Sequence, residues 1–170
     1  MLEAIKNRRS VRFYRDEPVS DADLNEVLAA GFCAPSAHNQ RAWHVVVVRD
    51  QAIKDKLAAI HPWSKMLSHV PVVLVVAVDK ESCSLDHFWI EDGSAFMENM
   101  LVQAAELNLG TCWVGIRGLK SESDDAEQRV RSACGLPEHF GILGLTPIGR
   151  SARYPGPHEP KLPEDRVHYL

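Results

Sequence analysis

The longest uninterrupted apolar stretch of the sequence runs from Val70 to Val78 and contains no charged side chain. It is too short to cross a bilayer as a helix, which takes about 20 residues. Valines dominate it, and an uninterrupted apolar run rich in β-branched residues is typical of a strand that is buried on both faces. We therefore expect a fold built around a buried sheet.

The rest of the chain alternates between apolar strands and amphipathic helices, which predicts an α+β fold with helices around one sheet. Ser20 has the chemistry of a helix N-cap, and Gly135 that of a C-cap. Residues 11–14 alternate like an edge strand or an extended link. We expect one domain over residues 1–170. Strands are expected at Trp43–Val48, Pro71–Val78, Thr111–Ile116 and Phe140–Ile148, and helices at 2–9, 20–34, 50–61, 93–109 and 123–134.

Composition excludes several classes of protein. The chain has 170 residues, 45% hydrophobic and 25% charged, which is average for a globular domain and unlike a disordered chain or a coiled coil. A net charge of −4 gives no general attraction to nucleic acid or anionic membranes, so neither is an expected partner. The N-terminus has no signal-peptide pattern, and the four cysteines are widely spaced. We therefore expect a cytoplasmic protein with free thiols.

The expected helix at 93–109 is apolar on nearly all of its faces. A helix of this kind is buried all round, and a domain of this size covers only one face of it with its own sheet. A second copy of the chain is the simplest cover for the other face, so we favour a homodimer over a monomer with a central core helix. The proline-rich tail, residues 151–170, then fits as an extended arm lying over the partner.

Several catalytic motifs are missing from the sequence. It contains no GxSxG, no GxGxxG after a strand, no phosphate-binding P-loop and no HExxH. No metal site is expected, because the eight histidines have no metal-ligand spacing. Cys112 is either a nucleophile or, more simply, a small buried thiol. We name no catalytic acid, base or nucleophile.

Three segments carry chemical signals. The run RRSVR, residues 8–12, places three guanidinium groups and a hydroxyl close together, as an anion site or as a solvated basic patch. The polar loop at 35–39 presents backbone amides and short side chains. The segment at 109–115, LGTCWVG, has glycines that permit close approach of a flat ligand.

The order of these segments resembles the nitroreductase family of flavin-dependent oxidoreductases. RRSVR comes first, APSAHN precedes a tryptophan and a valine-rich strand, and a buried helix ends in LGTCWVG. Further similarities are at 64–67, 135–137, 147–149 and 161–163. The resemblance covers almost the whole chain, and the ordered set is more specific than any one motif.

The resemblance implies a homodimer of α+β subunits with a mostly antiparallel sheet, exchanged C-terminal arms and FMN at the subunit interface. The N-terminal run matches the segment that reaches the phosphate, ribityl chain and pyrimidine edge, and the loop at 35–39 matches one that approaches from the partner subunit. Residues 113–115 match the segment along the ring, and the basic residues of the tail match phosphate ligands. The implied cofactor-binding residues are Arg8, Arg9, Ser10, Arg12, Pro35, Ser36, Ala37, Asn39, Lys65, Trp113, Val114, Gly115, Arg150 and Lys161.

The resemblance also implies the reaction. NADH or NADPH gives a hydride to flavin N5 and leaves, and a nitroaromatic, a quinone or a similar small acceptor then takes the electrons, in a ping-pong cycle. Arg12 is our candidate for the cation that stabilises the reduced ring. Two other hypotheses remain open: a flavin-binding or flavin-sensing module without NAD(P)H turnover, and a homodimeric binding domain without flavin.

The sequence departs from the family pattern in two places. After the asparagine the family usually has x-Q-P-W, whereas this chain has Gln40-Arg41-Ala42-Trp43, so the turn loses its proline. The segment before the long helix is short, and Phe88 and Trp89 either form a small roof over the site or pack on the core. We expect an open site of modest selectivity.

Overall fold

The computed structural model describes residues 1–119 and 125–170. In them, five strands form one antiparallel sheet in the order β1-β2-β5-β3, with β4 also paired to β5. The two long antiparallel pairings, β1 with β2 and β2 with β5, make up the centre of the sheet. The strands are β1 (Trp43–Val48), β2 (Val72–Asp79), β3 (Gly110–Thr111), β4 (Val114–Gly115) and β5 (Phe140–Gly149).

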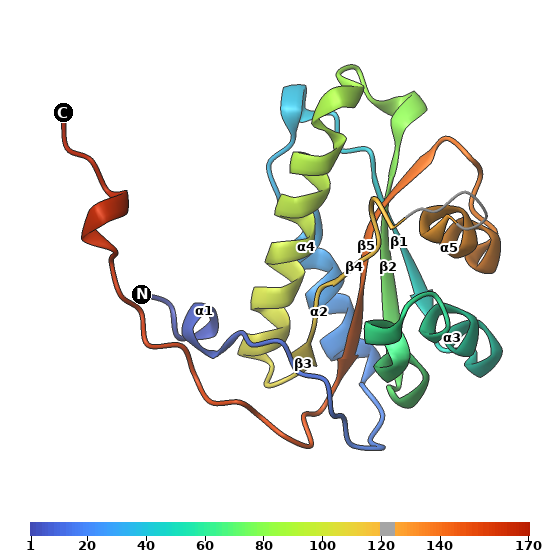
Figure 1. Ribbon diagram of the computed structural model, residues 1–170, viewed down its shortest axis with the longest axis horizontal. Helices are drawn as coiled ribbons and strands as arrows, with labels where there is room; N and C mark the ends of the chain where they lie inside the picture. The colour runs from blue at the N-terminus through green and yellow to red at the C-terminus, as the bar shows by residue number, and fades with distance from the viewer. Residues whose placement is uncertain (120–124) are drawn as a thin grey trace.

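Helices cover both faces of this sheet (Figure 1). α2 and α4 lie on one face, α3 and α5 lie on the other, and α1 packs beside α4. The α-helices are α1 (Glu3–Asn7), α2 (Asp21–Phe32), α3 (Gln51–Ala58), α4 (Trp89–Glu106) and α5 (Ala126–Cys134). Short 3-10 helices are η1 (Ala37–Asn39), η2 (Pro62–His69), η3 (Lys80–Ser82), η4 (Asp86–Phe88) and η5 (Glu164–Arg166).

The central strand β2 is buried on both faces, as its valine run predicts. Leu74 and Val76 belong to the apolar core shared with α2 and α4. Val73 and Val75 alternate with them and belong to the core shared with α3 and α5. Because strand side chains point alternately to the two faces, one apolar strand serves both cores.

α4 begins at Trp89, four residues before the expected start at Gly93. Its first turn carries Glu91 and Asp92, which interrupt the apolar pattern from which the expected start was taken. Acidic side chains are favourable in this position because they interact with the positive end of the helix dipole. The expectation of burial on every face is not met within one chain, since Ala95 and Val102 are only half-buried.

The single strand expected at 111–116 is in fact two short ones. β3 and β4 pair with the same strand, β5, in one continuous register, but the ladder is interrupted between them. Pro147 of β5 lies opposite this gap and has no N–H to donate. The Cys112 amide donates instead to the Thr146 hydroxyl, at 3.4 Å.

The ends of the chain follow the expected pattern. Residues 11–14 form an extended link, with isolated bridges at its two ends, Ser10 with Thr111 and Tyr14 with Ser151. Gly135 ends α5 in the left-handed conformation, with φ of 68°. The start of the helix expected at 123 lies outside the described residues. The tail first runs along the N-terminal segment and then extends away from the body of the molecule (Figure 1). No described helix is long and apolar enough to cross a membrane.

Candidate functional site

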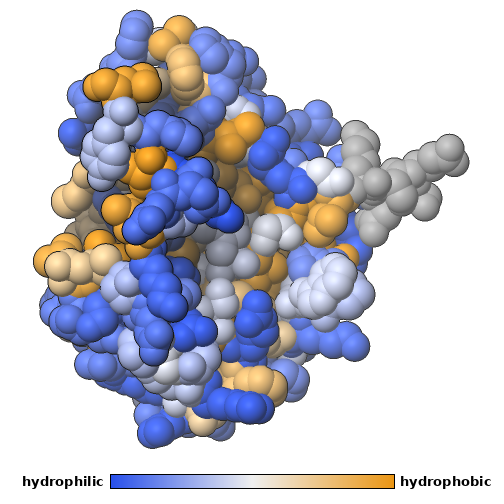
Figure 2. Space-filling view, turned by 60° about the vertical axis from the view of Figure 1, so that its left-hand side comes forward, coloured by the Kyte–Doolittle hydropathy of each residue, from blue (hydrophilic) through white to orange (hydrophobic). Residues whose placement is uncertain are grey.

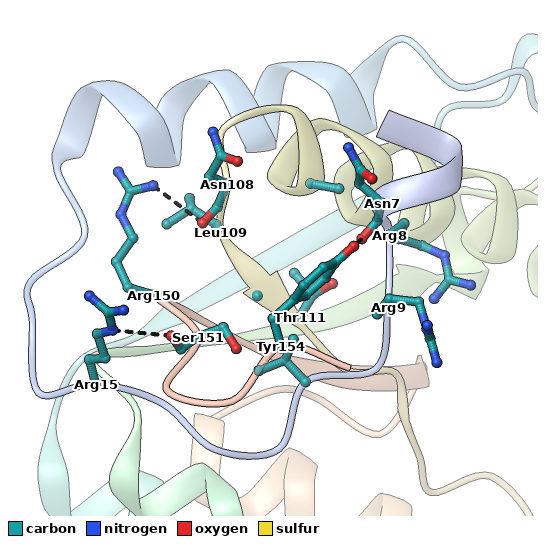
Figure 3. Close-up of a pocket in the computed structure, with 13 residues that line it drawn as sticks. Asn7, Arg8, Arg9, Arg15, Asn108, Leu109, Thr111, Arg150, Ser151 and Tyr154 are labelled. Atoms are coloured by element: carbon teal, nitrogen blue, oxygen red, sulfur yellow. Dashed lines mark hydrogen bonds between the residues drawn. The ribbon is translucent and has the colours of Figure 1, made fainter. Parts of the chain in front are cut away.

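A cavity of about 370 Å³ lies where the N-terminal segment crosses the end of α4 and the edge of the sheet (Figure 3). Its size lies within the range of small-molecule sites in proteins. Four of the residues around it are arginines, so the cavity is suited to an anionic ligand. The lining residues are Asn7, Arg8, Arg9, Val11, Arg15, Ala105, Asn108, Leu109, Gly110, Thr111, Arg150, Ser151 and Tyr154.

The arginine run is held against the sheet by its own backbone. The Val11 amide donates to the Thr111 carbonyl at 2.7 Å, and the Val11 side chain is 2% exposed. Gly110 makes this close contact possible, because a Cβ there would lie 2.9 Å from the Val11 Cβ. The link from Arg8 to Arg12 is thereby fixed along β3.

Arg8 and Arg150 approach the cavity from different elements. The Arg8 Nε lies 3.5 Å from the Glu98 carboxylate of α4. Arg150 follows β5 and donates from Nη1 to the Leu107 carbonyl at 2.7 Å, where it caps the C-terminal end of α4. Its Nη2 lies 3.5 Å from the Asp23 carboxylate. A guanidinium has five N–H donors, so these contacts leave donors for a ligand.

Ser151 contributes a hydroxyl that is buried yet has no hydrogen-bond partner among the described residues. Such an orphaned group is unusual, because burying a polar group without a partner costs free energy. Ser151 lines the cavity beside the arginines. With its side chain turned toward the cavity, Ser151 would complete its hydrogen bonding on a ligand with acceptor oxygens.

The C-terminal arm closes one side of the cavity. Tyr154 lies with Arg8 and Arg9 on one side of it and Arg150 on the other (Figure 3). Its hydroxyl donates to the Asn7 carbonyl at 3.1 Å. The Arg9 Nη1 donates to the Gly156 carbonyl, and the His158 amide donates to the Lys6 carbonyl at 2.8 Å. Arg9 therefore anchors the arm, a role that the sequence analysis did not include.

Arg9→Ala is expected to loosen the arm without unfolding the body of the molecule. Loss of a charge-assisted contact should make the His158 amide exchange its hydrogen about tenfold faster. Hydrogen exchange resolved to the segment around His158 is the measurement. Arg166→Ala, farther out on the same arm, is the control that should leave this rate unchanged. An equal rate in the Arg9 variant and the parent would contradict the anchoring role.

Other predicted residues continue from the cavity along the sheet edge. Ser10 bridges Thr111, and Arg12 is exposed two residues farther along. Trp113, Val114 and Gly115 follow Thr111. The Trp113 side chain is 37% exposed and lies over β5, where a Cβ on Gly144 would be 3.0 Å from its indole nitrogen. These residues form a strip next to the arginines.

The predicted loop at 35–39 lies far from the cavity within one chain, and Lys65 and Lys161 do not line the cavity. Pro35, Ser36, Ala37 and Asn39 lie at the N-terminal end of α4, where the Ala37 amide donates to the Asp92 carboxylate at 2.8 Å. The cavity lies at the C-terminal end of this 18-residue helix, about 27 Å away at 1.5 Å per residue. Lys65 lies on η2, which packs against α3, and Lys161 is exposed on the arm.

The structure also adds residues that the sequence analysis missed. Arg15, Asn108 and Tyr154 line the cavity, and none belongs to a motif. Asn108 has a left-handed backbone with φ of 56°, which is typical of asparagine at a helix end. Cys112 is a buried thiol, 4% exposed, and burial raises its pKa. This is the simpler of the two roles considered for Cys112.

The sheet, the helices on both faces and the arginine-lined edge define an α+β protein of the type found in flavin oxidoreductases, and comparison with known proteins identifies the family. The model of the nitroreductase family matches residues 5–61 and 61–150. The chain therefore belongs to the nitroreductase family.

Individual relatives agree with this assignment. The chain is 35% identical over 168 residues to the "Putative NADH dehydrogenase/NAD(P)H nitroreductase" of Methanothermobacter thermautotrophicus, covering 99% of this chain and 85% of that one. An FMN-dependent nitroreductase from Clostridium difficile has a TM-score of 0.91 and 29% identity, covering 99% and 98% of the two chains. A Desulfovibrio desulfuricans nitroreductase solved with FMN has a TM-score of 0.81 and 27% identity, covering 96% and 91%.

Proposed function

We propose that this protein is an FMN-dependent oxidoreductase that uses NADH or NADPH to reduce nitroaromatics, quinones or similar small acceptors. The observation that carries the proposal is the arginine-lined cavity with its orphaned Ser151 hydroxyl, in a chain of the nitroreductase family. Two related structures are named for FMN, one as FMN-dependent and one as its complex. The cytoplasmic location stays a prediction.

The residues around the cavity fit the anionic end of FMN. Arg8 and Arg150 supply guanidinium donors suited to a phosphate, and Ser151 supplies the unpaired hydroxyl. The strip formed by Ser10, Arg12 and residues 113–115 then offers an exposed indole and a glycine surface for the flat ring. Arg12, at the exposed end of the arginine run, would hold the pyrimidine edge. Arg9, Lys65 and Lys161 stay predicted ligands.

A second subunit would bring the two distant groups together. The arginine cavity and the loop at 35–39 lie at opposite ends of α4, so one chain cannot place both on one ligand. A two-fold axis across α4 would set the N-terminal end of one helix beside the C-terminal end of its partner. The loop of each subunit would then meet the cavity of the other. We therefore propose a homodimer with two equivalent FMN sites.

Uncovered apolar surface supports the same assembly. A groove between α1, α2 and α4 is lined by Leu2, Ile5, Ala29 and Val102. On the arm, Leu162 is 69% exposed and Tyr169 is 88% exposed. Figure 2 shows hydrophobic residues reaching the surface in several clusters between hydrophilic ones. A single domain at residues 1–170 whose arm (151–170) begins against its own N-terminal segment and then continues over a partner would cover both surfaces.

The protein's part in catalysis is to bind and to orient. When bound, FMN would supply the two-electron redox chemistry between NAD(P)H and the acceptor, which we propose to run as a ping-pong sequence. Arg12 would stabilise negative charge at the pyrimidine edge, and each ~1.4 kcal/mol of preference for the reduced form raises a two-electron potential by about 30 mV. Phe88, 39% exposed, would limit access from one side.

The test combines flavin binding with turnover. The purified protein is reconstituted with FMN, and oxidation of NADH and of NADPH is followed with a quinone and with a nitroaromatic. The proposal expects a yellow protein with steady turnover and parallel lines in double-reciprocal plots at varied acceptor concentration. A protein that binds FMN without turnover supports the sensing module instead. A protein that stays colourless contradicts the proposal outright.

A further inference from the structure

A buried carboxylate connects α4 to the loop that is proposed to reach the partner's flavin. Asp92 is 5% exposed and lies in the first turn of α4. Its Oδ1 accepts from the Ala37 amide at 2.8 Å, and its Oδ2 accepts from the Gln40 side-chain nitrogen at 2.6 Å. Its backbone carbonyl accepts from the Trp43 indole at 3.0 Å. One residue therefore holds the loop at Ala37 and Gln40, and the start of β1 at Trp43.

The Gln40 amide has only one orientation that satisfies its neighbours. Its Oε1 accepts from the Leu85 amide at 3.1 Å, while its Nε2 donates to Asp92 and, at 3.3 Å, to the Leu85 carbonyl. Rotating the amide by 180° would set its nitrogen against the Leu85 N–H and its oxygen against the carboxylate. Asp92 and Gln40 therefore form a hydrogen-bonded pair, which we call the bracket. It joins the loop to α4 and to the segment that leads to Phe88.

The loop needs such support because of its backbone. His38, Asn39 and Arg41 have φ of 47°, 55° and 48°, in the left-handed region that residues other than glycine rarely adopt. Such conformations persist only where surrounding contacts hold them. The proline that the family usually has in this turn is replaced by Ala42, which removes one source of rigidity.

Two further contacts lie within the loop and are weaker supports. The Arg41 amide donates to the Ser36 hydroxyl at 3.1 Å, and the Arg41 Nε donates to the Asn39 side-chain oxygen at 2.7 Å. Arg41 and Asn39 are exposed, so water competes for these bonds. The contacts to Asp92 are shielded from water and therefore dominate.

We propose that Asp92 and Gln40 form a positioning bracket that holds the loop at 35–41 in the shape needed to contact the partner subunit's FMN. The inference rests on the proposed function. Asp92 is a positioning residue: it acts through Ala37 and Gln40 and does not itself touch the cofactor. The same bracket fixes the loop relative to Leu85, and so relative to the segment that carries Phe88.

Asp92→Asn tests the bracket with a change of the same shape. The new amide can accept from the Ala37 N–H only by turning its own nitrogen toward the Gln40 nitrogen, so two donors face each other. We expect FMN to bind about tenfold more weakly. We also expect the Ala37 amide to exchange its hydrogen faster, as a readout that does not depend on the cofactor.

The double variant Asp92→Asn with Gln40→Glu reverses the polarity of the pair. The introduced carboxylate can accept both from the amide at position 92 and from the Leu85 N–H, and it gives up only the 3.3 Å bond to the Leu85 carbonyl. We expect FMN affinity to return to within about threefold of the parent. Asp50→Asn is the matched control: Asp50 caps α3 by accepting from the Ile53 amide at 3.0 Å, on the other face of the sheet. It should leave FMN affinity unchanged.

Each outcome has a distinct meaning. A parent protein that binds no FMN overturns the proposed function, and the flavin role of the bracket with it, before any variant is compared. A parent that binds FMN, with an Asp92→Asn variant of equal affinity and equal Ala37 exchange, overturns the bracket alone. Weak binding that the double variant does not restore also overturns it, because this indicates general damage to the fold.

Discussion

Arg8→Ala is expected to weaken FMN binding by about 100-fold, which is ~3 kcal/mol of binding free energy. Arg8 lines the cavity, and its side chain is 27% exposed, so its charge is partly shielded from water. Removing it deletes the donors proposed for the phosphate, whereas its present partner, Glu98, is 52% exposed and is easily solvated. Fluorescence titration of the apoprotein with FMN measures the effect.

Two control variants isolate the guanidinium's contribution. Arg8→Lys keeps the charge but loses the forked geometry, so its affinity should fall between those of the parent and the alanine variant. Arg49→Ala removes a surface arginine that pairs with Asp21 at 2.6 Å and should have no effect on FMN. If the Arg8→Ala protein retains FMN as tightly as the parent, the phosphate assignment is wrong.

Phe96→Ala is expected to lower the free energy of unfolding by ~4 kcal/mol, the usual cost of emptying a large buried aromatic site. Phe96 is fully buried in α4, and its ring lies 5.0 Å from Phe32 and 5.4 Å from Trp43. It also fills the space above Gly31 of α2, where a Cβ would lie 2.7 Å from the Phe96 ring. The substitution would therefore leave a new cavity in the core, where α2, α4 and β1 meet.

Urea denaturation at a fixed chain concentration measures this loss, because the stability of a dimer depends on concentration. Phe88→Ala, at a ring that is 39% exposed, is the control and should cost about 1 kcal/mol or less. A loss in the Phe96 variant no larger than in this control would show that Phe96 is not a central packing residue.

Much of the fold could be predicted from the sequence because its signals are local. The valine runs of β1 and β2 and the Ser20 and Gly135 caps depend on neighbouring residues alone, and the structure confirms them. The errors arose where tertiary contacts decide. The break between β3 and β4 depends on Pro147 across the sheet. The early start of α4 accompanies the packing of Trp89 on the core and the contacts of Asp92 to the loop at 35–40.

The candidate site divides in the same way. The arginine run and Arg150 could be found from the sequence, since a cluster of guanidinium groups in an acidic chain is a local signal. Tyr154, Ser151 and the anchoring contact of Arg9 could not, because they depend on how the arm folds back across the N-terminal segment. The bracket between Asp92 and Gln40 joins residues 52 positions apart and has no sequence motif.

The central claim is that two subunits are needed to build each flavin site, and one measurement tests it most directly. Light scattering coupled to size-exclusion chromatography, with absorbance recorded for protein and flavin, gives mass and FMN content in the same peak. The account predicts a particle with the mass of two chains that carries one FMN per chain. A single chain that holds FMN with full occupancy, or a dimer that excludes it, would contradict the account.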